Sequence, residues 1–214
     1  MATKGAFRVE CPHCGESFDA DFWTVVRGDR DLEVKELILS GEFDLLMCPK
    51  CEDMFPHEEP FLYIDPLKDI MAFVMPESYQ AQKEKWTAKM SADYEPLKAS
   101  LCAAQGLASE PLFLFGLAPL AALLEADRDR EEETEVMEFL AREEGMPLVP
   151  VKPAAARELD ITFTIPFPSG LEGRAAALKA AEALRAKNDA LPRLNKLIDT
   201  LSAMKDDSLP FLKD

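Results

Sequence analysis

The residues with the most specific chemistry in this sequence are four cysteines, arranged as two Cys-Pro-x-Cys motifs. Cys11 and Cys14 form the first motif, Cys48 and Cys51 form the second, and 33 residues separate Cys14 from Cys48. A Cys-x-x-Cys turn directs two thiolates towards one point, and two such turns complete a tetrahedral shell of four sulfur ligands. Because a closed shell leaves no position for a water molecule, the spacing predicts a zinc ion that stabilises structure rather than catalysing a reaction.

Two other interpretations of these cysteines stay open, namely redox-active pairs and unrelated buried thiols. A thioredoxin-like motif stands at the N-terminus of a helix within a strand–helix–strand unit, whereas both motifs here follow strand-like segments. Histidine adds little, because we expect His13 to be exposed inside the first motif, and His57 stands six residues after the second. The fifth cysteine, Cys102, lies on the apolar face of a helical segment, and we interpret it as a core residue.

The segments around the motifs are typical of a β-rich module that covers residues 1–77. Five segments predict strands from their alternating or continuous apolar residues: 7–9, 18–25, 45–47, 61–64 and 70–74. Asp31 is a candidate cap for a short helix that ends at Ser40-Gly41. The apolar face of this helix should consist of Leu32, Val34, Leu37 and Ile38.

Residues 78–214 predict a mainly helical domain with a small strand pair, so that we expect an α+β fold overall. Four segments have apolar residues that suit helices: 77–105, 111–124, 126–144 and 171–204, the last divided near Pro192. We interpret 111–124 as a buried central helix, with a partner-binding surface as the alternative. In 126–144, Val136, Phe139 and Leu140 should face inward, and the acidic run 131–135 should face solvent.

Two further segments of this domain, 148–151 and 159–165, predict the strand pair, since the second alternates apolar and polar residues. The last helical segment carries an apolar stripe that should face the core: Leu184, Leu191, Leu194, Ile198 and Leu201.

Residues 8–77 resemble the CpXC domain, a prokaryotic domain named for its two Cys-Pro-x-Cys motifs. The resemblance rests on these residues: Cys11, Pro12, Cys14, Gly15, Ser40-Gly41, Cys48, Pro49, Cys51, Tyr63-Ile64-Asp65 and Pro76-Glu77. The family has no assigned activity, so the resemblance implies a zinc ribbon and no catalytic residue. One position departs from the usual pattern, because Glu52 follows Cys51 where Gly15 follows Cys14. A non-glycine residue with left-handed backbone costs about 1 kcal/mol, so the second turn is either strained or built differently.

The charge of the chain argues against nucleic acid and anionic membranes as direct partners. The formal net charge is −16, with −10 in residues 1–77 and −6 in residues 78–214, so both parts would be repelled by phosphate. No apolar signal segment follows Met1, and the longest uncharged run, 111–124, is shorter than the ~20 residues that span a bilayer. We therefore expect a cytoplasmic protein.

The sequence as a whole favours a non-enzymatic, zinc-stabilised protein-interaction or scaffold protein. The alternative is a regulatory or accessory subunit of a nucleic-acid-processing machine, since zinc ribbons are common there. An enzyme ranks third, because no paired acid and base residues stand out and no glycine-rich phosphate loop is present. A protein partner or self-association is expected.

Overall fold

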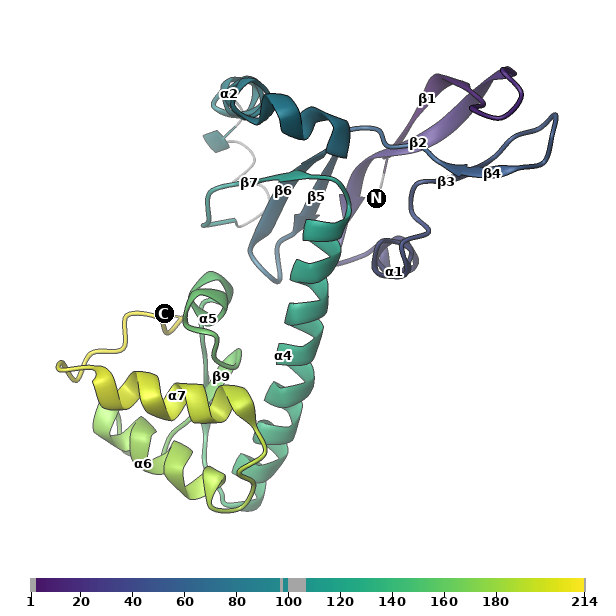
Figure 1. Ribbon diagram of the computed structural model, residues 1–214. Helices are drawn as coiled ribbons and strands as arrows, with labels where there is room; N and C mark the ends of the chain where they lie inside the picture. The colour runs from purple at the N-terminus through teal and green to yellow at the C-terminus, as the bar shows by residue number, and fades with distance from the viewer. Residues whose placement is uncertain (1–2, 97, 100–106, 214) are drawn as a thin grey trace. The chain divides into compact units, whose positions relative to one another are not determined.

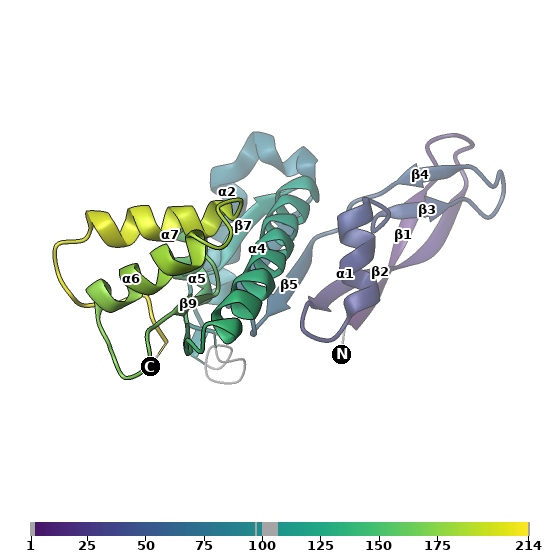
Figure 2. The same cartoon turned by 90° about the horizontal axis from the view of Figure 1, so that it is seen from below.

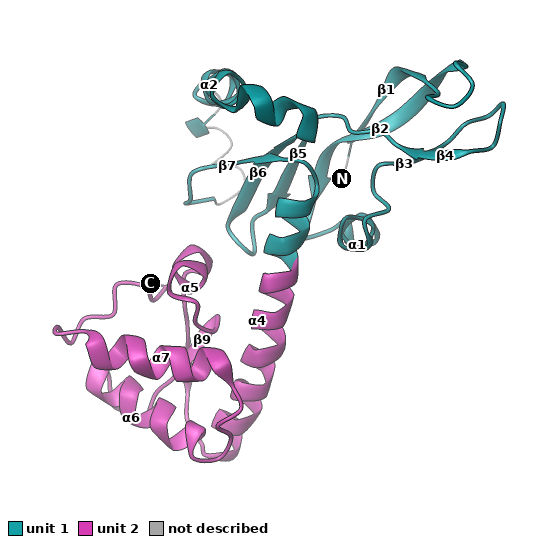
Figure 3. Ribbon diagram, viewed as in Figure 1, with its two compact units in different colours: residues 1–124 teal, residues 125–214 magenta. Residues whose placement is uncertain are grey.

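The computed structural model describes residues 3–96, 98–99 and 107–213, and the chain divides into two compact units. Unit 1 covers residues 1–124 and unit 2 covers residues 125–214 (Figure 3). Strands and helices occur in both units, so the expected α+β fold class is confirmed. Within the described residues, no helix combines the length and the apolar character that crossing a membrane requires.

A five-stranded mixed sheet with the order β1–β2–β5–β6–β7 organises unit 1 (Figure 1). Its strands are Thr3–Glu10, Ser17–Arg27, Phe61–Asp65, Ile70–Met75 and Leu112–Phe115. The β1–β2 and β5–β6 pairs are antiparallel, whereas β2 pairs with β5 and β6 pairs with β7 in parallel. The first four strands lie where alternating and apolar residues predicted them.

Helices cover both faces of this sheet (Figure 1 and Figure 2). On one face, buried side chains of α1 (Leu32–Ser40) and of the first turns of α4 (Ala118–Glu143) pack against the strands. On the other face lies Tyr94, the last residue of α2 (Lys83–Tyr94). A 3₁₀ helix, η1 (Glu77–Gln82), precedes α2. Both faces of the central strands are therefore apolar, which is why these strands appear in the sequence as continuous hydrophobic runs.

Strand β7 differs from the expectation of a helix over 111–124. The alternate side chains of Leu112–Phe115 meet those of β6, and the rings of Phe113 and Phe73 stack with centroids 5.5 Å apart. After the strand, Gly116 adopts a φ of 78°, and α4 begins only at Ala118. A short uncharged run carries too little periodicity to separate a buried strand from a buried helix. The expected helix is therefore replaced by a strand, a turn and the start of α4.

Unit 1 extends beyond the boundary expected at Glu77, because it includes β7. Because β7 forms the fifth strand of the sheet, residues after Glu77 return to complete unit 1, which extends to Leu124. The helix expected over 77–105 is seen as η1 and α2 up to Tyr94. Its positions Leu97, Leu101 and Cys102 lie outside the described residues.

Helix α1 confirms the expected bounds but only half of the expected apolar face. Val34 and Ile38 are buried, whereas Leu32 is 63% exposed and Leu37 is also exposed. The helix ends at Gly41, which has a left-handed backbone, as the sequence predicted. Asp31 precedes the helix without capping it, because its carboxylate accepts a hydrogen bond from the backbone N–H of Arg27 at 3.0 Å.

A separate hydrophobic core holds unit 2 together. Besides the C-terminal part of α4, this unit contains β8 (Leu148–Pro150), α5 (Pro153–Leu159), β9 (Thr164–Pro166), α6 (Arg174–Arg185) and α7 (Pro192–Ala203). β8 and β9 form the expected antiparallel pair. The strand expected over 159–165 is wrong at its start, because Leu159 ends α5 and β9 begins at Thr164. The predicted leucine stripe of α6 and α7 is buried throughout.

Helix α4 turns a different face inward from the one expected. Met137 and Ala141 are fully buried, whereas Val136 and Phe139 are exposed and Leu140 is half-buried. The acidic run 131–135 is also not uniformly solvated. Glu133 is buried, and its carboxylate accepts hydrogen bonds from the backbone N–H groups of Arg193 and Leu194 at 2.6 Å and 3.0 Å. These are free donors in the first turn of α7, so α4 supplies the cap that α7 lacks in its own sequence.

Candidate metal centre

The four predicted cysteines meet at one point in unit 1. Their sulfur atoms all lie within 4.8 Å of one another. Cys11 Sγ lies 3.8 Å from Cys51 Sγ, and Cys14 Sγ lies 3.7 Å from Cys48 Sγ. A regular tetrahedron with zinc–sulfur bonds of about 2.3 Å has sulfur–sulfur edges of about 3.8 Å. The four free thiols are therefore spaced as the ligands of a tetrahedral metal ion. In both of these close sulfur pairs, one cysteine comes from the first motif and the other from the second.

Two hairpins hold these cysteines, and their turns lie at the same end of unit 1 (Figure 1). The first motif connects β1 to β2, and the second connects β3 (Leu45–Met47) to β4 (Met54–Pro56). In each turn the first cysteine accepts a backbone hydrogen bond of 3.0 Å from the fourth residue after it, Gly15 or Glu52. Each first cysteine also donates its own N–H to the fifth residue after it. The two turns are thus equivalent, as two halves of one ligand set require.

Glu52 adopts the backbone conformation that glycine adopts in the first turn. Its φ is 60°, close to the 69° of Gly15. The sequence left open whether the second turn is strained or differently built, and the structure shows the same geometry with a residue that disfavours it. This left-handed backbone costs about 1 kcal/mol in a residue with a side chain.

A small apolar cluster surrounds half of the site. Cys11 and Cys48 are buried with Val9, Phe22 and Phe55, whereas Cys51 is half-buried and Cys14 is exposed. A metal ion would therefore lie where the ribbon meets solvent, held on its inner side by apolar packing. So few buried side chains bury little apolar surface, and a bound metal ion would add stability that this cluster alone does not provide.

The thiols of the site favour opposite protonation states. The pKa of Cys48 is lowered to about 7, chiefly because the backbone amides of Cys51 and Lys50 stabilise its thiolate. The pKa of Cys51 is raised to about 12 although the Asp53 amide favours its thiolate, because burial and the three other sulfurs disfavour further negative charge. Four thiolates at this spacing need a compensating cation, and a bound metal ion supplies that charge as the protons leave.

An ion pair between the two turns was not predicted from the sequence. Lys50 Nζ, in the second turn, lies 2.8 Å from Glu16 Oε2, which follows the first turn, so the pair links the two turns. The pKa of Glu16 is lowered by this contact, first through the hydrogen bond and then through the charge of Lys50. The two residues stand 34 positions apart, and no local pattern links them. At this exposure, solvent screens the pair and it contributes little to stability.

Neither histidine joins the sulfur cluster. His13 is exposed, as expected, and His57 Nε2 lies 3.1 Å from Glu59 Oε1 while its ring packs near Phe22. Within the part of the chain that the structure describes, the four cysteines are the only group of three or more Cys, His, Asp or Glu side chains that could hold a metal ion.

Comparison with known proteins places a protein family on this chain. A family model described as CpXC protein matches residues 9–138, more than half of the chain. The matched segment contains both cysteine motifs and all strands of the five-stranded sheet after the start of β1, so it extends well beyond the 8–77 range of the sequence resemblance. No curated protein and no solved structure gives a significant match.

Proposed function

This chain belongs to the CpXC protein family, and we propose that it is a non-enzymatic protein-interaction or scaffold protein whose unit 1 is stabilised by zinc. The observation that carries this proposal is the arrangement of the four sulfurs, whose spacing uses every coordination position of a tetrahedral ion. Four thiolates favour zinc among the common divalent metals, and zinc brings no redox chemistry. A closed zinc shell stabilises a fold and leaves recognition to the surrounding surface.

Exposed apolar side chains near the metal centre support an interaction role. Met47 and Met54, on the two strands of the second hairpin, are 64% and 61% exposed. Contiguous apolar surface of this kind marks a contact site more often than a free surface. The net charge of −16 favours a basic protein as the partner, and the paired cysteines suit the reducing cytoplasm.

The second candidate function, an accessory subunit of a nucleic-acid-processing machine, is favoured by one local feature. The rings of Tyr79 and Trp86 stack with centroids 4.2 Å apart, and Lys85 and Lys89 lie 5.2 Å and 5.3 Å from the Trp86 ring. Aromatic and basic side chains on one surface are typical of contact with single-stranded nucleic acid. The acidic charge of the whole chain opposes such binding, so we rank this function second.

Three measurements on the purified protein test these functions together. Elemental analysis should give one zinc per chain, and Cys48→Ser should lose it. Capture from native lysate should recover a protein partner that Cys48→Ser does not bind, while titration with mixed-sequence DNA and RNA should show no submicromolar affinity. Stoichiometric iron, or full zinc binding by Cys48→Ser, would contradict the metal assignment. Failure to recover a zinc-dependent partner, together with tight nucleic-acid binding, would make the accessory-subunit function the better one.

A further inference from the structure

We propose that the outer face of the β3–β4 hairpin and the cavity beside it form one docking surface for a basic, apolar segment of a partner protein. This inference rests on the proposed interaction function and adds the place of contact and the chemistry of the partner. We call the surface formed by Leu45, Met47, Met54 and Pro56 the hairpin face.

The hairpin face is an apolar surface that unit 1 leaves uncovered. Leu45 pairs with Pro56 and Met47 pairs with Met54, so these four side chains share one side of the hairpin. The intervening pair, Leu46 and Phe55, lies on the opposite side and packs into the core around the cysteines. All four residues of the hairpin face are exposed. Methionine side chains adapt to different apolar partners, which suits a contact surface.

A cavity of about 760 Å³ continues this surface towards the sheet. Leu45 and Pro56 line the cavity as well as the hairpin face, so the two are contiguous. Its apolar wall comes from the end of α1 and the start of α4, including Leu39 and Ala121, and from Leu117 just before α4. A side chain with an apolar stem and a polar end would fit such a space.

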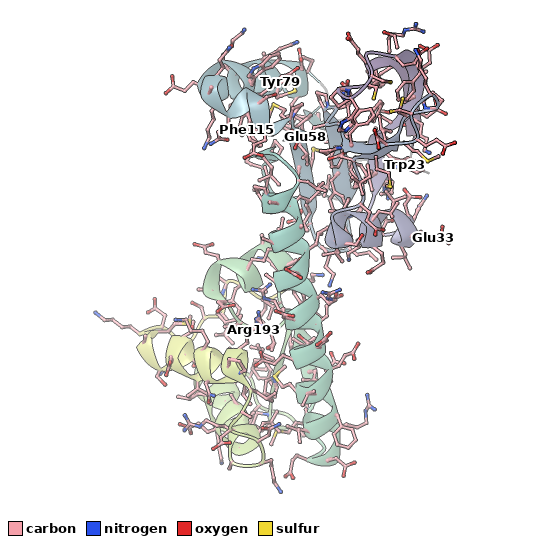
Figure 4. The ribbon with its side chains drawn as sticks, turned by 45° about the vertical axis from the view of Figure 1, so that its right-hand side comes forward. Trp23, Glu33, Glu58, Tyr79, Phe115 and Arg193 are labelled. Carbon is pink, nitrogen blue, oxygen red and sulfur yellow. The ribbon has the colours of Figure 1, made fainter. Side chains whose placement is uncertain are left out.

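The polar wall of the cavity is acidic. Asp44, Glu58 and Glu77 line it, and no lysine or arginine is among its lining residues. Glu58, labelled in Figure 4, directs one carboxylate oxygen to the backbone N–H of Glu77 at 2.7 Å. The pKa of Asp44 is raised to about 7, first because its carboxyl group is buried and then because Glu58 is negative. A cation in the cavity would favour the charged form of Asp44 and offset its repulsion from Glu58.

The charge around this surface selects the occupant. Residues 41–59 contain six Asp and Glu against one Lys, so the surroundings are acidic as well as the cavity. Nucleic acid and a second copy of this acidic chain would both be repelled. A peptide segment with an arginine or lysine next to apolar residues is complementary to both the acidic cavity and the hairpin face. Its cation enters the cavity, and its apolar side chains cover Met47 and Met54.

Selection from a random 12-residue peptide library on the immobilised, zinc-loaded full-length protein tests this surface. We expect enrichment of peptides that combine Arg or Lys with apolar residues. We expect two double variants to bind the best peptide more weakly: Met47→Ser/Met54→Ser and Asp44→Asn/Glu58→Gln. Each should raise the dissociation constant by about ten-fold, equivalent to about 1.4 kcal/mol. Zinc content and circular dichroism of each variant establish that it is folded.

Two matched control variants in unit 2 separate a specific surface from general attraction to an acidic protein. Val136→Ser/Phe139→Ser removes exposed apolar side chains, and Glu132→Gln/Glu135→Gln makes the same two carboxylate-to-amide replacements as the cavity variant, but at exposed positions. Both controls should bind the selected peptide within two-fold of the unaltered protein. Equal weakening by test and control variants would overturn the proposal, as would selected peptides without basic residues or no enrichment at all.

Failure of the docking surface can be told apart from failure of the interaction function. A lysate partner that needs zinc but binds both test variants normally would refute this surface and leave the interaction function standing. A dimer in light scattering that Met47→Ser/Met54→Ser converts to a monomer would replace the basic segment with a second copy as the occupant. If no zinc-dependent partner is recovered, the interaction function itself is wrong.

Discussion

Glu52 stands at a backbone position that glycine fills in the first cysteine turn. Because its φ is 60°, replacing it with glycine should remove a local strain of about 1 kcal/mol. Part of this gain is offset by the greater freedom of glycine in the unfolded chain, so we expect Glu52→Gly to raise the free energy of unfolding of zinc-loaded unit 1 by about 0.5 kcal/mol.

Urea denaturation followed by a signal from unit 1 measures this change, and Gly15→Ala is the matched reverse substitution. A Cβ at Gly15 meets its nearest atom only at 3.9 Å, so the cost of Gly15→Ala comes from backbone conformation and not from crowding. It should lower the free energy of unfolding. If Glu52→Gly destabilises unit 1, the side chain of Glu52 contributes more than its strained backbone costs.

Asp44 should make unit 1 less stable as the pH rises. Its pKa is raised to about 7, chiefly by burial, so the folded state binds a proton more tightly than the unfolded state does. The stabilisation is complete below the ordinary value near 3.8 and is lost as the pH rises through 7. Asp44→Asn should therefore increase stability at pH 8 and have little effect at pH 4.

Thermal unfolding of Asp44→Asn and of the unaltered protein at pH 5, 6, 7 and 8 gives the comparison, with exposed Glu132→Gln as the control. The difference between Asp44→Asn and the unaltered protein should grow from pH 5 to pH 8. A difference that is the same at every pH would show that the carboxyl group of Asp44 is not protonated in the folded state.

At the scale of single residues, the sequence predicted that the four cysteines meet at one point, because this grouping depends on residue type and short spacing. The Glu133 contact could not be predicted in this way. The contact depends on Arg193, which stands 60 positions away and reaches Glu133 only after both helices have formed. Within an acidic run, nothing in the sequence distinguishes Glu133 from its exposed neighbour Glu132.

Helix α7 depends on Glu133 for the start of its first turn. The buried carboxylate accepts hydrogen bonds from two backbone N–H groups and lies 3.3 Å from Nη1 of the partly buried Arg193. Glu133→Ala would leave these donors without an acceptor, at a cost of about 3 kcal/mol. Hydrogen exchange should therefore show lower protection in the first turn of α7, whereas Glu132→Ala should leave it unchanged. Equal effects of the two substitutions would mean that α7 begins without this cap.

Among the elements, most of those with a clear period agreed with the sequence, whereas a uniformly apolar run and one alternating segment did not. The alternation of β1 and β2 and the leucine stripe of α6 and α7 identified these elements correctly. The run Leu112–Phe115 is uniformly apolar, so only its partner β6 determines that it forms a strand. Alternation over 159–165 was misleading, since Leu159 ends a helix and Ile161 and Thr162 are both buried despite being adjacent.

For the whole molecule, metal removal should affect the two units unequally. The cysteine end of unit 1 has a small apolar cluster, whereas unit 2 has a large core of its own. Chelation followed by hydrogen exchange should therefore remove protection from β1–β4 and leave the unit 2 helices α6 and α7 protected. Refilling with zinc should restore the original pattern. Equal loss in both units would show that the metal holds them as one cooperative structure.

The position of β7 in the sheet gives the chain an order of assembly during its synthesis. The fourth cysteine of the site is made at residue 51, whereas the fifth strand of the sheet is complete only at residue 115. At a translation rate of about 5–20 residues per second, roughly 3–13 s separate these two events. The four cysteines can therefore come together on the ribosome before β7, the fifth strand of the sheet, has been synthesised. From the synthesis of Met75 until β7 is complete, β6 is an unpaired sheet edge that a chaperone or another nascent chain can contact.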